Sequence, residues 1–151
     1  MGGKGILVKL FRLIDKGLPV PLIGSGQTAY QMVSVFDVVS AIEKAVEKGL
    51  PNREYNLGSA NPKSTREVLT SVIHCAKSKS FLISTPGWLV KLCLAFLEKI
   101  GLPLMYREQY KIADINYLVD TTETTAELGW APQYSDGDMM KQAFLEYKNI
   151  L

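Results

Sequence analysis

The sequence has few cysteines and histidines, and each shortage excludes a class of protein. Its 151 residues include two cysteines, Cys75 and Cys93, and one histidine, His74. Two cysteines cannot form the dense disulfide framework of a small secreted domain, so we expect a cytoplasmic protein. A single histidine offers neither a tetrahedral metal site nor a serine hydrolase triad, and no G-x-S-x-G elbow is present.

Charge is nearly balanced, and long hydrophobic runs are missing. Seventeen basic and fifteen acidic residues give a net charge of +2, which provides no basic field for nucleic acid or acidic lipid. The longest strictly apolar run, residues 92–97, is far too short to cross a bilayer. Four basic residues are spread through the apolar positions of the first twenty residues, unlike the separate regions of a signal peptide.

The sequence does contain an alternation of helical and extended patterns. With 47% hydrophobic residues, the chain is long enough to form one domain over residues 1–151. Short extended runs predict strands at 19–23, 32–36, 53–59 and 81–85. Apolar residues at helical spacing predict helices near 6–16, 37–48, 64–76, 88–100, 106–117, 122–128 and 136–148. The alternation favours an α/β domain with α+β character.

One motif resembles a dinucleotide-binding loop but lies in the wrong context. In GSGQTA, Gly24, Gly26 and Ala29 satisfy the G-x-G-x-x-G/A pattern. Such glycines should open a helix whose N-terminal amides meet the pyrophosphate, whereas Ala29 is followed by an extended run. The acidic residue expected about twenty positions later is also missing. We therefore predict a turn between two short strands and keep cofactor binding here only as a minor alternative.

Other catalytic patterns are absent or weak. No tyrosine is followed four residues later by a lysine, whose ammonium group would lower the phenol pKa for acid–base catalysis. The carboxylate pair Glu43/Glu47 is most simply part of a solvated helix face. The pair Asp136/Asp138 most simply marks the start of a helix. We therefore predict no catalytic residue, and whether the chain is an enzyme stays open.

Three segments in order carry a family resemblance. Residues 21–46 contain a G-x-G turn, an extended run and then Asp-Val before a helix, and residues 55–73 contain an extended run, a Pro-x-x-Thr turn and a helix. Residues 119–132 end in Leu-Gly-Trp-x-Pro. Together they resemble the C-terminal part of NAD-dependent epimerase/dehydratase proteins, in the extended branch of the short-chain dehydrogenase/reductase family. Residues 77–112 contribute least to the resemblance.

The resemblance implies a substrate lobe without its catalytic half. In the family, an N-terminal Rossmann half supplies both the Gly-rich NAD loop and a Tyr-x-x-x-Lys pair. We therefore expect the substrate-binding region of an NAD-dependent epimerase, dehydratase or reductase, inactive alone and acting on a nucleotide sugar or similar small carbonyl or hydroxyl compound. NAD or NADP is implied for the full-length family protein, and no cofactor is expected to bind this chain alone.

Two kinds of partner are compatible with this expectation. The first is the missing Rossmann half, and the second is another copy of the chain. Residues 54–58 match a strand that in the family adds to the Rossmann sheet, so without that sheet they are predicted to form an exposed edge or a dimer contact. The alternative function is a non-catalytic interaction or ligand-binding module that buries the 88–100 helix against a partner or itself.

The resemblance also assigns candidate residues. Asp37 matches the family Asp at the strand-to-helix joint, where a carboxylate accepting first-turn amides explains it, so we predict Asp37 as a helix cap. Independently of the resemblance, Ser64 is followed three residues later by Glu67, which fits a capping box, so we predict Ser64 as a helix cap. Family members that bind sugar nucleotides carry an Arg seven residues before this Asp, where Tyr30 stands here. A second family Arg falls near Tyr110, with Arg107 as the closest basic residue.

The family arginines at these two positions would donate bidentate hydrogen bonds to phosphate. Because the chain lacks an arginine at one or both positions, the case for a nucleoside-diphosphate substrate is weaker. Hydrogen bonding from Tyr30 and Gln31 could still hold a sugar, a steroid-like compound or another small carbonyl compound. The alternative for Tyr30 is packing over the preceding turn. The predicted substrate-binding residues are Tyr30, Gln31, Arg107 and Tyr110.

Overall fold

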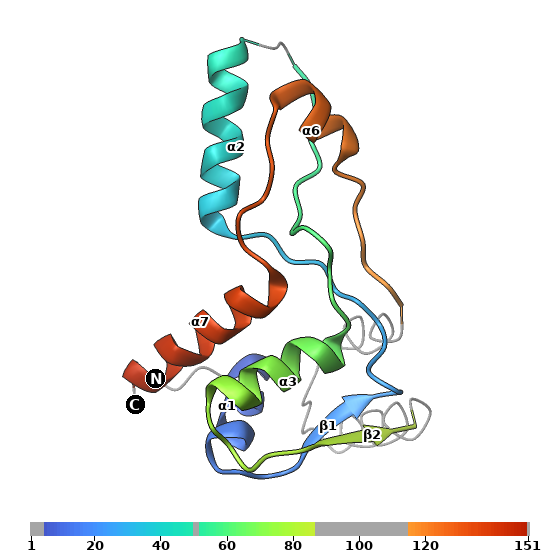
Figure 1. Cartoon of the computed structure of the whole chain (residues 1–151), viewed down its shortest axis with the longest axis vertical. Helices are drawn as coiled ribbons and strands as arrows, with labels where there is room; N and C mark the ends of the chain where they lie inside the picture. Colours follow the sequence, from blue (N-terminus) through green and yellow to red (C-terminus); the bar gives the residue numbers. More distant parts are fainter. Residues whose placement is uncertain (1–4, 50–51, 87–114, 151) are drawn as a thin grey trace, which may run out of the picture.

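The computed structural model describes residues 5–49, 52–86 and 115–150. In these ranges the chain forms five helices and two short strands. They are α1 (Ile6–Asp15), β1 (Val20–Ile23), α2 (Val35–Lys48), α3 (Thr65–Cys75), β2 (Leu82–Thr85), α6 (Thr122–Leu128) and α7 (Asp136–Ile150). Figure 1 shows an elongated molecule with α2 and α6 at one end and the remaining elements at the other. The predicted mixed fold of several helices and few short strands is confirmed.

The larger core lies at the end that holds the sheet. The helical spacing of residues 64–76 predicts that Leu69, Val72, Ile73 and Ala76 point inward. The first three are buried, and Ala76 is partly buried against the same core. From the neighbouring helices, Phe11 and Phe144 meet edge to face, with ring centroids 5.5 Å apart and an interplanar angle of 85°. The buried members of this core are Phe11, Ile14, Val20, Leu22, Val68, Leu69, Val72, Ile73, Met140 and Phe144.

The sheet consists of β1 and β2, which pair in parallel from Val20 opposite Leu82 to Ile23 opposite Thr85. A parallel pair needs a long crossover connection, and here that connection contains both α2 and α3. The strand predictions at 19–23 and 81–85 are therefore confirmed.

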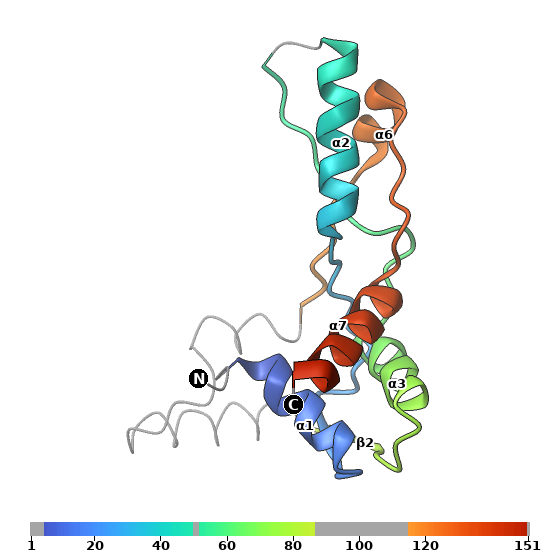
Figure 2. The same ribbon diagram turned by 90° about the vertical axis from the view of Figure 1, so that its left-hand side faces the viewer.

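A second, smaller core joins α2 to α6. Ala41, Leu128 and Trp130 are buried together, and Tyr55 and Leu57 pack against them. The Trp130 indole N–H donates to the Asp37 carbonyl oxygen at 3.1 Å. The Leu-Gly-Trp motif is thus a structural unit: its outer residues fill the core, and its glycine ends α6 at φ 63°. Figure 2 shows α2 and α6 side by side beyond α7.

Two predicted strands are absent from the described part of the chain. Ser34 is the N-cap of α2, so Val35 and Phe36 already belong to its first turn. A half-buried strand would bury every second side chain. Val35 and Phe36 are adjacent and both more than half exposed, so the alternation does not mark such a strand. Residues 53–59 are extended but pair with no strand in the described ranges, because the sheet lies at the opposite end of the molecule.

Several predictions fall on other parts of the chain. The predicted helix at 88–100, most of the one at 106–117, and Cys93 lie outside the described residues. Within residues 5–49, 52–86 and 115–150, no helix is long and apolar enough to span a membrane. The same ranges contain no group of three or more His, Cys, Asp or Glu side chains placed to hold a metal.

Candidate functional site

A cavity of about 430 Å³ lies between α1, β1, α3 and residues 28–32. Its volume is in the range of small-molecule binding sites, and most of its wall is aliphatic. The polar side chains on its lining, as far as the structure describes them, are Thr28, Tyr30, Lys63 and Thr65. The main apolar contributors are Leu7, Leu10, Leu22, Ile23, Met32 and Leu69.

The turn after β1 positions the polar edge of this cavity. Gly24 and Gly26 have φ values of 64° and 74°, which glycine adopts readily. A Cβ atom on Gly26 would lie 2.7 Å from Cδ1 of Leu22, so the absence of a side chain there lets the turn close over β1. The predicted turn is confirmed, although an extended segment without a strand follows it.

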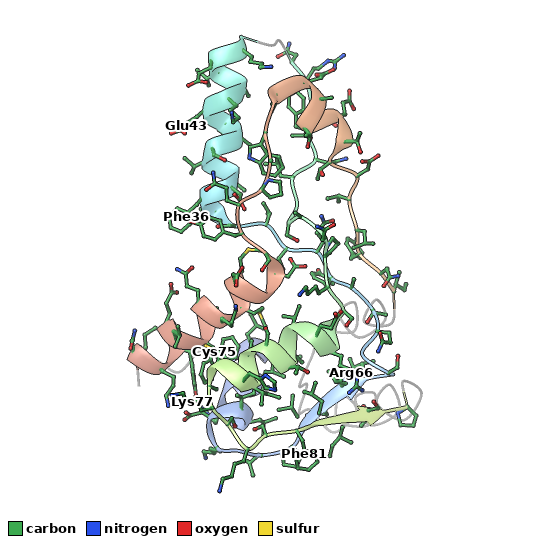
Figure 3. The ribbon with its side chains drawn as sticks, in the orientation of Figure 1. Phe36, Glu43, Arg66, Cys75, Lys77 and Phe81 are labelled. Carbon is green, nitrogen blue, oxygen red and sulfur yellow. The ribbon has the colours of Figure 1, made fainter. Side chains whose placement is uncertain are left out.

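The same turn is fastened to the N-terminal end of α3. The Arg66 guanidinium donates through Nε and Nη2 to the Ser25 carbonyl oxygen at 3.0 and 2.8 Å. The backbone N–H and hydroxyl of Thr65 both donate to the Thr28 carbonyl oxygen, at 2.9 and 2.8 Å. Figure 3 places Arg66 at the end of α3 nearest the sheet. The cavity edge is therefore held by α3.

This geometry does not fit a dinucleotide loop. The next helix after Gly26 is α2, which begins only at Val35. Gly24–Ala29 therefore does not itself open a helix, as the glycines of a dinucleotide loop do, and the neighbouring N-terminus of α3 is capped by Ser64 and Glu67. Ala29 instead forms an isolated antiparallel bridge with Ser64.

Of the predicted substrate-binding residues, Tyr30 lines the cavity. Its side chain is 54% exposed, and its ring stacks on Tyr117 with centroids 5.6 Å apart. The hydrogen bonds of the Gln31 side chain are internal: Nε2 donates to the Ser59 carbonyl oxygen at 2.7 Å, and Oε1 accepts from the Val119 N–H at 2.8 Å. Substrate binding by either residue stays a prediction.

Arg107 and Tyr110, the other two predicted substrate-binding residues, lie outside the described residues. Lys63 was not predicted, and it is the one charged side chain among the described residues that line the cavity. Lys63 stands directly before the cap of α3 in the sequence, and nothing in its local pattern marks it as a cavity residue.

The prediction that Ser64 caps its helix is confirmed. Its hydroxyl accepts from the Glu67 backbone N–H at 3.3 Å, and its own backbone N–H donates to Oε2 of Glu67 at 3.0 Å. This reciprocal pair is a capping box. Hydrogen bonds from the Ser64 hydroxyl and backbone N–H, with a smaller effect of the Lys63 charge, lower the pKa of Glu67.

The prediction that Asp37 caps its own helix is wrong. Because Ser34 is the N-cap, Asp37 is the third residue of α2, and its side chain is 1% exposed. Its carboxylate accepts from the backbone N–H of Gln133 at 2.9 Å and from that of Tyr134 at 3.3 Å. Asp37 therefore ties α2 to the segment that leads into α7, away from the cavity.

Asp136 makes a second internal connection of the same kind. It is 2% exposed, and its Oδ1 accepts from the Met32 backbone N–H at 3.0 Å and from the Ser59 hydroxyl at 2.6 Å. Both buried aspartates thus join segments that cross between the two cores.

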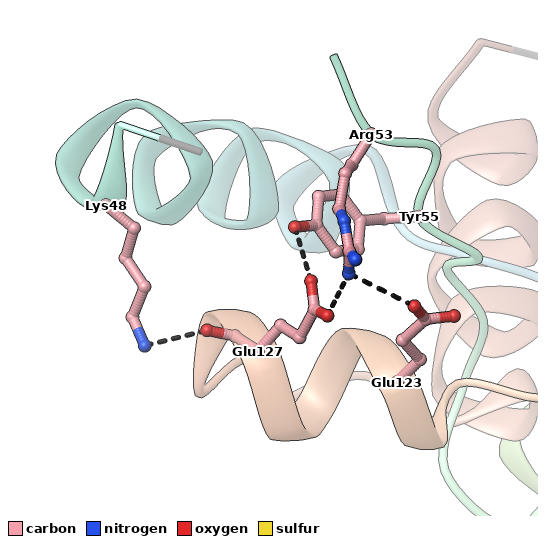
Figure 4. A network of polar contacts seen from close by, with 5 residues as sticks. All are labelled: Lys48, Arg53, Tyr55, Glu123 and Glu127. Atoms are coloured by element: carbon pink, nitrogen blue, oxygen red, sulfur yellow. Dashed lines mark hydrogen bonds and ion pairs between the residues drawn. The ribbon is translucent and has the colours of Figure 1, made fainter. Parts of the chain in front are cut away.

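A polar network on the surface fastens α6 to residues 53–55 (Figure 4). Arg53 pairs with Glu127 and, at 3.3 Å, with Glu123. The Tyr55 hydroxyl donates to Glu127 at 2.9 Å, and Lys48 donates to the Glu127 carbonyl oxygen at 2.7 Å. The hydrogen bonds from Arg53 and then Tyr55 lower the pKa of Glu127. The network lies apart from the cavity and is structural.

Sequence comparison relates the chain to longer proteins. It is 32% identical over 149 residues to the uncharacterized protein y4nG of Sinorhizobium fredii, covering 97% of this chain and 37% of that protein. It is 27% identical over 131 residues to dTDP-glucose 4,6-dehydratase of Haemophilus influenzae, covering 87% and 36%. The chain thus spans less than two fifths of the length of these curated relatives. No protein-family model matches it.

Solved structures share the fold. UDP-glucose 4-epimerase of Thermotoga maritima, solved with UDP-glucose, matches with a TM-score of 0.64 and 19% identity, over 97% of this chain and 40% of that one. dTDP-glucose 4,6-dehydratase of Bacillus anthracis, solved with NAD, matches with a TM-score of 0.62 and 18% identity, over the same shares. In sequence and in fold, the chain is therefore related to the C-terminal part of the NAD-dependent epimerase/dehydratase proteins.

Proposed function

We propose that the chain is the substrate-binding region of an NAD-dependent epimerase, dehydratase or reductase and acts together with a dinucleotide-binding half. The observation that carries this proposal is the cavity of about 430 Å³ edged by Tyr30 and Lys63, in a chain similar to dTDP-glucose 4,6-dehydratases. The substrate class is a nucleotide sugar or a similar small carbonyl or hydroxyl compound.

The cavity suits a ligand with a broad apolar face and few charges. The Tyr30 ring can lie against the carbon face of a sugar or a base, while its hydroxyl donates or accepts a hydrogen bond. Lys63 supplies one flexible point charge rather than the bidentate contact of an arginine. A diphosphate would therefore be held more weakly here than in a site with arginines.

The chemical step would depend on groups that this chain does not contain. The sequence lacks a Tyr-x-x-x-Lys pair, and the Gly24–Ala29 turn does not fit a pyrophosphate. A dinucleotide-binding half would therefore have to hold NAD or NADP. The chain itself would bind the substrate, orient it and shield it from water with the aliphatic wall of the cavity.

Ligand-observed NMR with dTDP-glucose tests the proposal on the chain itself. We expect weak, saturable binding that Lys63→Ala lowers by about tenfold, since hydrogen bonds to charged groups contribute about 1.5–3 kcal/mol. Lys79→Ala, an exposed lysine that does not line the cavity, is the matched control and should bind as the wild type does. Absence of binding, or equal losses in both variants, would refute this site and favour a non-catalytic interaction module.

A further inference from the structure

The sheet of β1 and β2 leaves large apolar side chains exposed on its outer face. On the inner face Val20 is buried in the larger core, and Leu82 opposite it packs against the same core. Because side chains alternate along a strand, the neighbours of Leu82 lie on the outer face. These neighbours, Phe81 and Ile83, are 57 and 42% exposed. Parallel sheets are normally covered on both faces, so this face marks a surface for a partner.

The loop before β1 lies beside the loop before β2. A Cβ atom on Gly17 would lie 3.7 Å from Cβ of Lys79, so the two loops touch at this point. Leu18, the residue after Gly17, is 44% exposed. The loops therefore bring a further apolar side chain and several lysines to the edge of the outer sheet face. We call Lys16, Leu18, Lys77, Lys79, Phe81 and Ile83 the β1–β2 patch.

The lysines of the β1–β2 patch have few acidic neighbours. Residues 16–36 and 68–86 contain no aspartate or glutamate. The nearby Asp15 pairs with Lys148 at 2.7 Å, and none of the three patch lysines forms an ion pair with any other described residue. The net charge of +2 therefore conceals a local excess of positive charge at this end of the molecule.

Helix α1 extends the positive charge beyond the patch. Lys9, Arg12 and Lys16 follow one another at spacings of three and four residues, so they form one row along the helix. All three are exposed, and helical geometry places them opposite the buried Phe11 and Ile14. The row begins beside the patch lysines at Lys16 and adds two further cations.

Exposed apolar side chains among lysines suit the surface of an anionic bilayer. Leucine and phenylalanine can enter the boundary between headgroups and acyl chains, while lysines are attracted to acidic headgroups. A second copy is a poorer occupant, because pairing two identical patches would bring like charges together. Nucleic acid would engage the lysines through its phosphates and leave the sheet face uncovered.

We propose that the β1–β2 patch docks the chain on the surface of a membrane that contains anionic lipid. Leu18, Phe81 and Ile83 would enter the interface, and the lysines would lie among the headgroups. The contact is peripheral, in keeping with the lack of a membrane-spanning helix among the described residues. The proposal goes beyond the proposed function, since no residue of the patch lines the cavity.

Cosedimentation of the purified chain with sucrose-loaded vesicles tests the proposal. The vesicles consist of phosphatidylcholine with about 30% phosphatidylserine, and vesicles of phosphatidylcholine alone are the comparison. We expect saturable binding to the anionic vesicles that weakens as salt is added. Binding to the neutral vesicles should be much weaker.

Two pairs of variants separate the patch from the rest of the surface. Phe81→Ala should bind the anionic vesicles about tenfold more weakly, whereas Phe36→Ala, at 58% exposure on α2, should bind as the wild type does. Lys79→Ala should bind about fivefold more weakly, and Lys44→Ala, the same change of charge on α2, should bind as the wild type does. Figure 3 shows Phe81 beside the sheet and Phe36 on α2, well apart.

Failure of the wild type to sediment with anionic vesicles would overturn the proposal, as would equal binding to neutral vesicles. Equal losses in Phe81→Ala and Phe36→Ala would also overturn it, because binding would not depend on the patch. Self-association in sedimentation velocity that Phe81→Ala abolishes would assign the patch to a second copy instead. Circular dichroism of each variant checks that the fold is intact. dTDP-glucose binding is the separate readout: if it is missing while vesicles bind, the proposed substrate site fails and the docking surface stands.

Discussion

Replacing Asp37 tests the assignment of this residue as a tie between distant segments. Its carboxylate is buried and accepts from two backbone amides, those of Gln133 and Tyr134. Asp37→Ala would leave both amides without a partner, at about 1–3 kcal/mol each. Because the Tyr134 contact is long at 3.3 Å and removing a buried charge recovers part of the loss, we expect a total of about 2–4 kcal/mol.

The matched comparison is Ser34→Ala, which removes the N-cap of the same helix. Ser34 accepts from the Phe36 backbone N–H at 3.3 Å, and loss of such a cap costs about 1 kcal/mol. Urea unfolding followed by far-ultraviolet circular dichroism gives the free energy of unfolding for each variant. Asp37→Asn, which keeps one acceptor oxygen, should lie between the two alanine variants.

The result that would refute the assignment is an Asp37→Ala variant no less stable than Ser34→Ala. Asp37 would then contribute only as much as a first-turn acidic residue of α2. Wild-type stability combined with a loss of dTDP-glucose binding would refute the assignment in another way, since it would place Asp37 in the substrate site.

The turn after β1 and the α6 network give two further predictions. Gly24→Ala and Gly26→Ala both force alanine into a left-handed conformation, but only the Gly26 change drives a Cβ atom to 2.7 Å from Leu22. Gly26→Ala should therefore be less stable than Gly24→Ala by about 1–3 kcal/mol in urea unfolding; equal losses would contradict the packing role. Hydrogen bonding from Arg53 lowers the pKa of Glu127, so its stabilising effect is present above the ordinary value of 4.5 and disappears as the pH falls through the lowered one. Glu127→Gln should reduce stability at about pH 7 and flatten its decline in acid; an unchanged acid decline in thermal unfolding would argue against this network.

Features that depend on neighbouring residues could be predicted from the sequence. The capping box of Ser64 and Glu67 spans four residues, and the inward face of α3 follows from helical spacing alone. The turn at Gly24 and Gly26 was predictable because the extended run after it excludes a dinucleotide loop. The same local reasoning placed β1 and β2.

Features that depend on distant residues could not be predicted. Gln133 and Tyr134 lie 96 and 97 positions from Asp37, so a local joint motif gave only the cap interpretation. Residues 53–59 have the composition of a strand, but a strand also needs a neighbour, and the sheet lies elsewhere. Lys63 lines the cavity together with residues 28–32, which lie far from it in the sequence, and no local pattern reveals that neighbourhood.

A fluorescence titration of NADH into the purified wild-type chain is the most direct test of the account. We expect no saturable change for the chain alone, because the Gly24–Ala29 turn does not open a helix that could receive the pyrophosphate and the adjacent N-terminus of α3 is already capped by Ser64 and Glu67. Tight, saturable binding by the chain alone would contradict it, and would make GSGQTA a cofactor site and the chain an enzyme candidate by itself.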